Sequence, residues 1–152
     1  MARIRLEQIL SPLSLSGDSL VIEGQGRVGF EILNQLDKVD YIIVPIGGGG
    51  LASGVSALVK QINPKIKIIG VEPLGAASMK EAIKQDRVVT LATITNLVDG
   101  AAVKRVGELN FNICRETLDD IILIDEGHVC SKILEVYNQH SYIIEPAGVL
   151  SL

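Results

Sequence analysis

Four consecutive glycines, Gly47 to Gly50, are the residues whose type and spacing most clearly indicate chemistry in this sequence. They stand between an apolar run and a stretch with helical periodicity. Because glycine has no Cβ, such a run lets the backbone turn tightly and direct several N–H groups to one point. The N-terminus of the following helix adds the positive end of its dipole. The segment therefore predicts a phosphate-binding loop that needs no cation, although a tight strand-to-helix turn is the simpler alternative.

The residues around the glycines narrow the kind of phosphate. A P-loop requires Lys followed by Ser or Thr, and Leu51 and Ala52 stand there instead, which argues against nucleoside triphosphate hydrolysis. A dinucleotide site is the main alternative. Gly47, Gly49 and Ala52 satisfy the pattern G-x-G-x-x-G/A, and Glu72 ends the next strand, where a ribose ligand would lie.

Hydrophobic periodicity predicts the elements that must position this loop. Strands are expected at 41–46, 66–71 and 121–124, with shorter ones at 20–22, 87–91 and 141–144. Helices are expected at 28–36, 51–62, 76–85, 107–118 and 125–137, the last capped by Asp125. Strands that alternate with helices through short loops are typical of a three-layer α/β sandwich with a mainly parallel sheet.

The N-terminal part of the chain carries weaker signals. A second G-x-G-x-x-G match, Gly24 to Gly29, falls between the strand predicted at 20–22 and the helix at 28–36. The strand after it ends in glycines rather than in an acid, so we expect this match to be coincidental. Residues 1–19 cluster Ser, Pro and Gly, and they are set apart as an unrecognised segment before a domain at 20–152.

Composition and charge exclude several classes of protein. A chain of 152 residues fits one domain or one piece of a larger protein, and a 47% hydrophobic content rules out intrinsic disorder. The net charge of −4 argues against binding to nucleic acid or to an anionic membrane. No apolar run approaches the ~18 residues of a transmembrane helix. Two cysteines are too few for a disulfide framework, so we expect a cytoplasmic protein.

No metal site is expected. His128 and Cys130 are two residues apart on a predicted helix and therefore point to different faces, and His140 is remote from them. Cys114 fits the apolar stripe of the helix at 107–118 and is expected in the core. Lys104 and Arg105 are expected to be solvated or to lie at an interface.

Several segments, taken in order, resemble the C-terminal half of the catalytic domain of threonine dehydratases. They are IVPIGGGGLASG, IKIIGVEP, VDGAAVKRVGELNF, LDDIILID and IEPAG, preceded by VIEGQGRVGFEILNQL. The resemblance covers residues 20–152 and implies a partial domain of the fold type II pyridoxal-phosphate enzymes, whose fold is like that of the tryptophan synthase β chain. Serine racemase and serine dehydratase share this scaffold, but the DGAAVKR form is closer to threonine dehydratases.

This resemblance implies a pyridoxal 5'-phosphate site. Its phosphate would lie on the amides of Gly47, Gly48, Gly49, Gly50 and Leu51. The cofactor ring would lie beside Gly100, in the turn that begins at Asp99, and beside Glu145. Ordinary structural roles are the alternatives, with Asp99 capping its own turn and Glu145 starting a strand-to-helix junction.

In serine racemases the glutamate of VEP helps to bind a divalent cation, together with a backbone carbonyl and an acid. Glu72 and the carbonyl of Ala76 are present here, but Ser78 stands where the acid is expected. Because hard cations require several oxygen ligands, we expect no metal at this position.

The implied activity is the deamination of L-threonine, or of L-serine, to a 2-oxo acid and ammonia; from threonine the product is 2-oxobutanoate, a precursor of isoleucine. The family's lysine, which holds the cofactor as a Schiff base, occurs in a Phe-Lys-x-Arg-Gly-Ala context, and none of the eight lysines here does. The Ser-x-Gly-Asn-His and Ser-Gly-Gly/Ala-Asn segments are also absent, and Arg27 replaces the threonine of GQGT. We therefore expect a fragment without a catalytic residue of its own, inactive alone.

Two further expectations follow. A sheet without its flanking elements exposes apolar surface, so we expect a homo-oligomer. An NAD-binding Rossmann-like domain and a non-catalytic remnant or interaction module remain alternatives to the lyase-family domain.

Overall fold

The computed structural model describes residues 19–152, so the unrecognised segment expected at 1–19 lies outside the described residues except for Ser19. Three parallel strands form its sheet in the order β1-β2-β3. They are β1 (Tyr41–Pro45), β2 (Lys67–Pro73) and β3 (Asp120–Ile124). Tyr41 pairs with Lys67, and Ile69 pairs with Asp120. The three longer predicted strands and their parallel arrangement are confirmed.

The helices are α2 (Ser19–Gln35), α3 (Gly50–Ile62), α4 (Ser78–Lys84), α5 (Glu108–Thr117), α6 (Glu126–His140) and α7 (Pro146–Val149), with a 3₁₀ turn, η2, at Leu74–Ala76. The helices predicted at 51–62, 76–85, 107–118 and 125–137 are confirmed within a few residues. Asp125 caps α6 as predicted, because its carboxylate accepts the N–H of Gly127 at 2.8 Å.

The three short strands predicted at 20–22, 87–91 and 141–144 are wrong. Residues 20–22 form the first turns of α2, since a run of three apolar residues fits a helix as well as a strand. Residues 87–91 are not a strand, although the N–H of Leu91 donates a hydrogen bond to the carbonyl of Lys104. Residues 141–144 have no strand partner among residues 19–152, and Ile143 is 94% exposed.

The second G-x-G-x-x-G match lies inside α2 and is coincidental as a phosphate motif, as expected. Two of its glycines, Gly26 and Gly29, serve helix packing instead. A Cβ on Gly26 would lie 3.2 Å from the carbonyl oxygen of Gly54, and a Cβ on Gly54 would lie 2.4 Å from that of Ile22. Side chains at these positions would force α2 and α3 apart.

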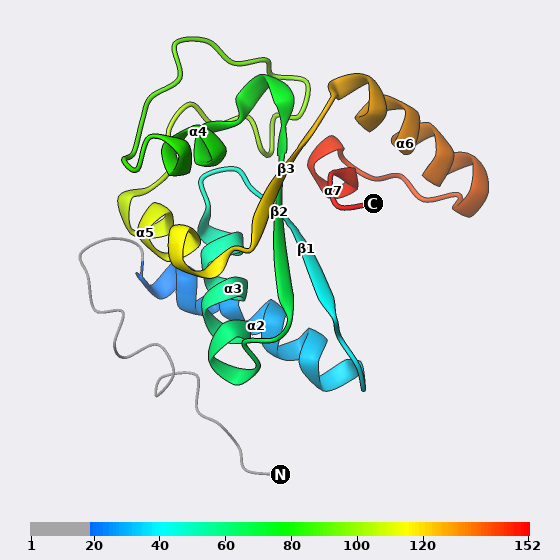
Figure 1. The fold of residues 1–152 in the computed structure, drawn as a ribbon. Helices are drawn as coiled ribbons and strands as arrows, with labels where there is room; N and C mark the ends of the chain where they lie inside the picture. The colour runs from blue at the N-terminus through cyan, green and yellow to red at the C-terminus, as the bar shows by residue number, and fades with distance from the viewer. Residues whose placement is uncertain (1–18) are drawn as a thin grey trace.

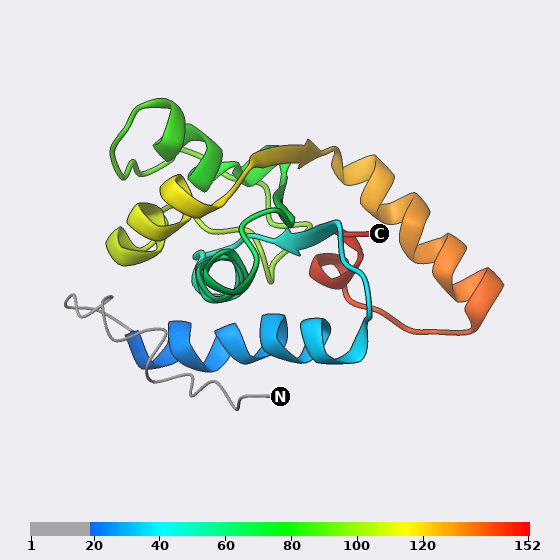
Figure 2. The same ribbon diagram turned by 60° about the horizontal axis from the view of Figure 1, so that its bottom comes forward.

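The elements form three layers. Figures 1 and 2 show α3, α4 and α5 on one side of the sheet, with α2 outside α3, and α6 with α7 on the other side. The larger core joins the first side to the sheet and includes Ile68, Leu58 and Cys114, the last buried as predicted. A smaller core joins Val71 to Val129 and Val149 on the second side. Within residues 19–152, no helix is both long and apolar enough to cross a bilayer.

Candidate cofactor-binding site

The glycine loop connects β1 to α3 at the carboxyl end of the sheet, the edge where parallel α/β folds bind ligands. Gly49, at the N-cap of α3, has a left-handed backbone with φ of 94°. A Cβ there would also lie 2.8 Å from Cε of Met79 and 2.9 Å from Cβ of Asn110. Both the backbone angle and the surrounding space therefore require glycine at this position.

The loop presents a set of unpaired backbone donors. The N–H groups of Gly48, Gly49, Gly50 and Leu51 donate to no acceptor within the described part of the chain. The first N–H groups of a helix have no partner inside it, and α3 adds the positive end of its dipole at the same place. This arrangement fits a phosphate group without any cationic side chain.

A pocket of about 330 Å³ lies directly over these donors. It is lined by Pro45, Gly47, Gly48, Gly49, Gly50, Leu51, Gly100, Ala101, Glu145, Ala147 and Gly148. All seven residues predicted from the sequence to bind a cofactor thus line one pocket. That they bind a cofactor remains a prediction.

The side of the pocket opposite the glycine loop is formed by the turn at Gly100 and the segment of Glu145 and Ala147, which contact each other. A Cβ on Gly100 would lie 3.0 Å from Cβ of Ala147 and 3.5 Å from Oε1 of Glu145. Asp99 does not line the pocket, because its carboxylate accepts the N–H of Gly100 at 2.8 Å and so caps its own turn. Glu145 immediately precedes α7, so it is both a pocket residue and the start of a junction.

Glu72 lies away from this pocket. Its completely buried carboxylate accepts the N–H groups of Met79 at 2.7 Å and Lys80 at 2.9 Å. Burial raises the pKa of Glu72 to about 7, although these hydrogen bonds act in the opposite direction. It is therefore not presented to a ribose at the glycine loop, which weakens the dinucleotide alternative.

Residue types that commonly ligate metals are dispersed in the described part of the chain. No group of three or more His, Cys, Asp or Glu residues is placed to hold an ion in the range 19–152. His128 and Cys130 are both exposed on α6. The hydroxyl of Ser78, where serine racemases were expected to have an acid, is buried and has no hydrogen-bond partner among residues 19–152.

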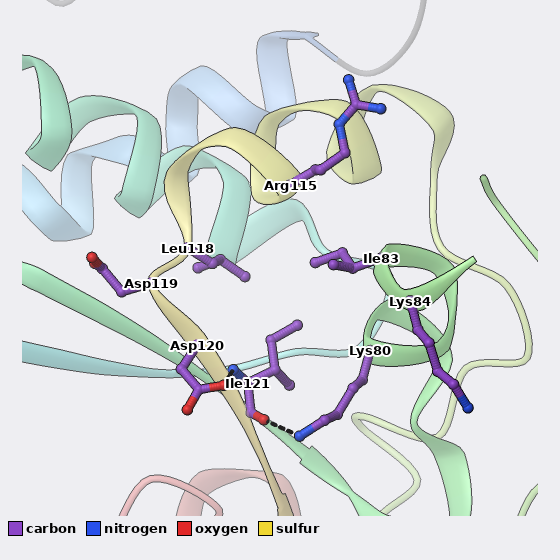
Figure 3. A pocket seen from close by; sticks show the side chains of 8 residues that line it. All are labelled: Lys80, Ile83, Lys84, Arg115, Leu118, Asp119, Asp120 and Ile121. Atoms are coloured by element: carbon purple, nitrogen blue, oxygen red, sulfur yellow. Dashed lines mark hydrogen bonds between the residues drawn. The ribbon is translucent and has the colours of Figure 1, made fainter. Parts of the chain in front are cut away.

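A second pocket of about 330 Å³ lies between α4, α5 and β3 (Figure 3). It shares no lining residue with the glycine-loop pocket. Its charged groups are engaged with the protein. Lys80 donates from Nζ to the carbonyl of Ile121 at 2.5 Å, and Arg115 pairs with Asp86 at 2.8 Å. It presents no row of unpaired donors, so the glycine-loop pocket is the better anion site.

Sequence patterns missed two side chains that hold the glycine loop, Ser53 and Asn110. Ser53 lies in the first turn of α3 and donates from Oγ to the carbonyl of Gly49 at 2.7 Å. Asn110, from α5, donates to the carbonyl of Gly48 at 2.8 Å. The contact of Asn110 depends on the tertiary fold and leaves no recognisable spacing. The contact of Ser53 is local, since Ser53 stands four residues after Gly49.

Known proteins resemble this chain in sequence over most of its length. The family model for pyridoxal-phosphate dependent enzymes matches residues 8–152. The biosynthetic L-threonine dehydratase IlvA of Halalkalibacterium halodurans is 50% identical over 133 residues, which cover 87% of this chain and 32% of that protein. The IlvA protein of Bacillus subtilis is 48% identical over 136 residues, 89% of this chain and 32% of the relative. The chain thus spans about a third of the length of these curated relatives.

Solved structures give the same result. A processed form of threonine deaminase isoform 2 from Solanum lycopersicum is 41% identical with a TM-score of 0.85, over 88% of this chain and 39% of that one. Maize serine racemase is 34% identical with a TM-score of 0.84, over 88% and 42%. The resemblance to threonine dehydratases is confirmed, and pyridoxal phosphate is the cofactor of the family. By sequence and fold, this chain belongs to the pyridoxal-phosphate dependent enzymes.

Proposed function

We propose that this chain supplies the phosphate-binding part of the cofactor site of a biosynthetic threonine dehydratase. Such an enzyme converts L-threonine to 2-oxobutanoate and ammonia. The observation that carries the proposal is the row of unpaired N–H groups from Gly48 to Leu51 in a pocket that also includes Gly100 and Glu145. The identity of 48–50% to biosynthetic relatives supports the choice of threonine over other amino acids.

Each part of the pocket has a separate task in this proposal. The loop amides bind the phosphate of the cofactor, and their number and fixed direction replace a cationic side chain. Gly100, without a Cβ, lets the segment of Glu145 and Ala147 approach closely beside the ring, and Glu145 offers a carboxylate to the same pocket. When bound, pyridoxal phosphate supplies an electron sink for the substrate's α-carbon.

We propose that the 152-residue chain does not deaminate threonine by itself. No residue that lines the pocket is a lysine, and none of the eight lysines stands in the family's Phe-Lys-x-Arg-Gly-Ala context. A group outside the described residues then has to remove the proton from the α-carbon. The free thiols of Cys114 and Cys130 fit a reducing cytoplasm, which we propose as its location.

Calorimetric titration of the chain with pyridoxal phosphate, inorganic phosphate and NAD tests the binding proposal. We expect saturable binding of pyridoxal phosphate, competition by inorganic phosphate, and no binding of NAD. Binding of NAD alone would support the dinucleotide alternative, and binding of none of the three would support a non-catalytic module.

A coupled assay for 2-oxobutanoate tests the second proposal. Chain, threonine and pyridoxal phosphate are incubated together, and the control contains threonine and cofactor only. We expect equal rates in the two. A higher rate with the chain would show that it carries its own catalytic base.

A further inference from the structure

We propose that Asn110 is a positioning residue of the cofactor site. Together with Ser53, it holds the carbonyl groups of the glycine loop on the protein side, so that the loop's N–H groups point into the pocket. This inference rests on the proposed function, because the phosphate of the cofactor is the group that these N–H groups would bind.

The side chain of Asn110 reaches the loop from α5. Its Nδ2 donates to the carbonyl oxygen of Gly48 at 2.8 Å. The N–H of Gly107, just before α5, lies 3.3 Å from the same oxygen and donates to it as well. The carbonyl of Gly48 is therefore fixed by two donors from one segment.

Ser53 extends this anchor to the next peptide groups. Its hydroxyl lies 2.7 Å from the carbonyl oxygen of Gly49, 3.0 Å from that of Gly50 and 3.2 Å from Oδ1 of Asn110. A hydroxyl has one proton, so it serves one of these acceptors at a time. Because Ser53 is completely buried, water does not compete for these contacts.

The geometry of the peptide bond converts these anchors into a direction for the donors. In a trans peptide the C=O and the following N–H point to opposite sides of the chain. Fixing the carbonyl of Gly48 toward α5 therefore points the N–H of Gly49 away from α5. Fixing the carbonyl of Gly49 toward Ser53 does the same for the N–H of Gly50.

Glycine makes such an anchor necessary. A Cβ added to Gly48 would meet nothing within 4 Å, so packing does not hold this peptide group in place. Glycine also has access to a wide range of backbone angles. Without Asn110, the longer 3.3 Å bond from the N–H of Gly107 is the one donor left to this carbonyl among the described residues. The peptide between Gly48 and Gly49 then rotates more readily and presents its carbonyl oxygen to the pocket, where it would repel a phosphate.

Two substitutions of Asn110 test the inference in the full 152-residue chain. Asn110→Asp keeps the shape but replaces the donor with a carboxylate, and Asn110→Leu removes the donor without adding charge. Asn112→Asp and Asn112→Leu are matched controls, because Asn112 is an exposed residue of the same type on α5. Affinities for pyridoxal phosphate and inorganic phosphate are measured by calorimetry, and the amide signals of the loop glycines by ¹⁵N NMR.

We expect both Asn110 variants to bind each ligand at least tenfold more weakly, which corresponds to about 1.4 kcal/mol. The amide signals of Gly49 and Gly50 should shift in these variants even without ligand. The Asn112 variants should bind within about twofold of the unsubstituted chain. Equal affinity in the Asn110 and Asn112 variants would overturn the inference while leaving the proposed function intact.

Two other outcomes also decide the inference, namely no binding by the unsubstituted chain and loss of folding in the Asn110 variants. If the unsubstituted chain binds neither ligand, the proposed function and this inference are both overturned. If these Asn110 variants do not fold, as judged by circular dichroism, Asn110→Ala replaces them, since it removes the donor to Gly48 without adding bulk or charge. Undiminished binding by a folded Asn110→Ala variant would then contradict the inference.

Discussion

Gly49 and Gly48 are neighbours in the same loop, yet their surroundings differ. We expect Gly49→Ala to lower the free energy of unfolding by roughly 1–3 kcal/mol, because the φ of 94° and the contacts below 3.0 Å with Met79 and Asn110 are both unfavourable to a Cβ. Gly48→Ala should change stability by less than about 0.5 kcal/mol, since nothing lies within 4 Å of the added atom. Urea unfolding measures both, and equal losses would mean that the loop conformation differs from the one described.

Glu72 should make the stability of the chain depend on pH in an unusual direction. Its pKa is raised from the ordinary 4.5 to about 7 by burial, so the folded state binds a proton more readily than the unfolded state. This contribution is fully present below pH 4.5 and is lost as the pH rises to about 7, with a change of about 3 kcal/mol.

Glu72→Gln isolates this effect, because glutamine stays neutral at every pH and keeps a carbonyl that can accept one of the α4 amides. Urea unfolding of both proteins from pH 4 to pH 8 gives the difference in stability. We expect this difference to move in favour of the glutamine variant as the pH rises. Parallel curves would show that Glu72 does not change its pKa on folding.

Asp119 joins three elements where α5 leads into β3. Its carboxylate accepts from Nζ of Lys60 at 2.6 Å, from Nζ of Lys67 at 2.8 Å and from the N–H of Ile68 at 2.8 Å. Burial alone would raise the pKa of Asp119, but these hydrogen bonds together hold it below its usual range. The ionised carboxylate therefore ties α3 and β2 to the start of β3.

We expect Asp119→Asn to lower the free energy of unfolding at pH 7 by about 2 kcal/mol, because its side chain is only 19% exposed and accepts charged donors. A lowered pKa stabilises the fold above the usual value near 3.8, so the loss should shrink as the pH falls below about 4. Asp120→Asn is the control, since among residues 19–152 the Asp120 carboxylate accepts only the N–H of Ile121. Equal losses in the two variants would contradict the bridging role.

Long apolar runs predicted their elements correctly and short ones did not, for a physical reason. The runs at 41–46 and 66–71 are long, continuous and bounded by turn residues, and in the structure they form the strands that they predict. The run at 20–22 is too short to separate the two periods, and the glycines after it resembled a loop. Their actual role, close packing of α2 on α3, depends on a partner about 30 residues away and leaves no local signature.

In the candidate site, features that are local in sequence were predictable and contacts between distant residues were not. The glycine loop was predictable because its chemistry is local, and Gly100 and Glu145 followed from the family resemblance. Asn110 was not predictable, since its acceptor on Gly48 is 62 residues away in sequence. A spacing pattern cannot report such a contact, because only the packing of α5 against α3 brings the two residues together.

One face of the sheet is only partly covered, and this predicts how the whole chain behaves in solution. Side chains alternate between the two faces of a strand, so Ile43 points away from the core that buries Ile42 and Val44. Ile43 is 48% exposed, Tyr41 66% and Ile122 46%, all on the side where α6 and α7 pack against Val71 and Ile124. Exposed apolar surface of this kind favours association.

We expect the apparent mass in sedimentation velocity to rise with protein concentration, as the homo-oligomer proposed from the sequence requires. Ile43→Lys should lower it toward that of a monomer, because a charge on the open face opposes burial. Leu74→Lys is the matched control: it adds the same charge at a residue that is 54% exposed on η2, which begins after β2 ends and is not part of the sheet. A monomer at every concentration, or equal effects of the two lysines, would show that this face does not mediate contacts, and the exposed strands would then need a different explanation.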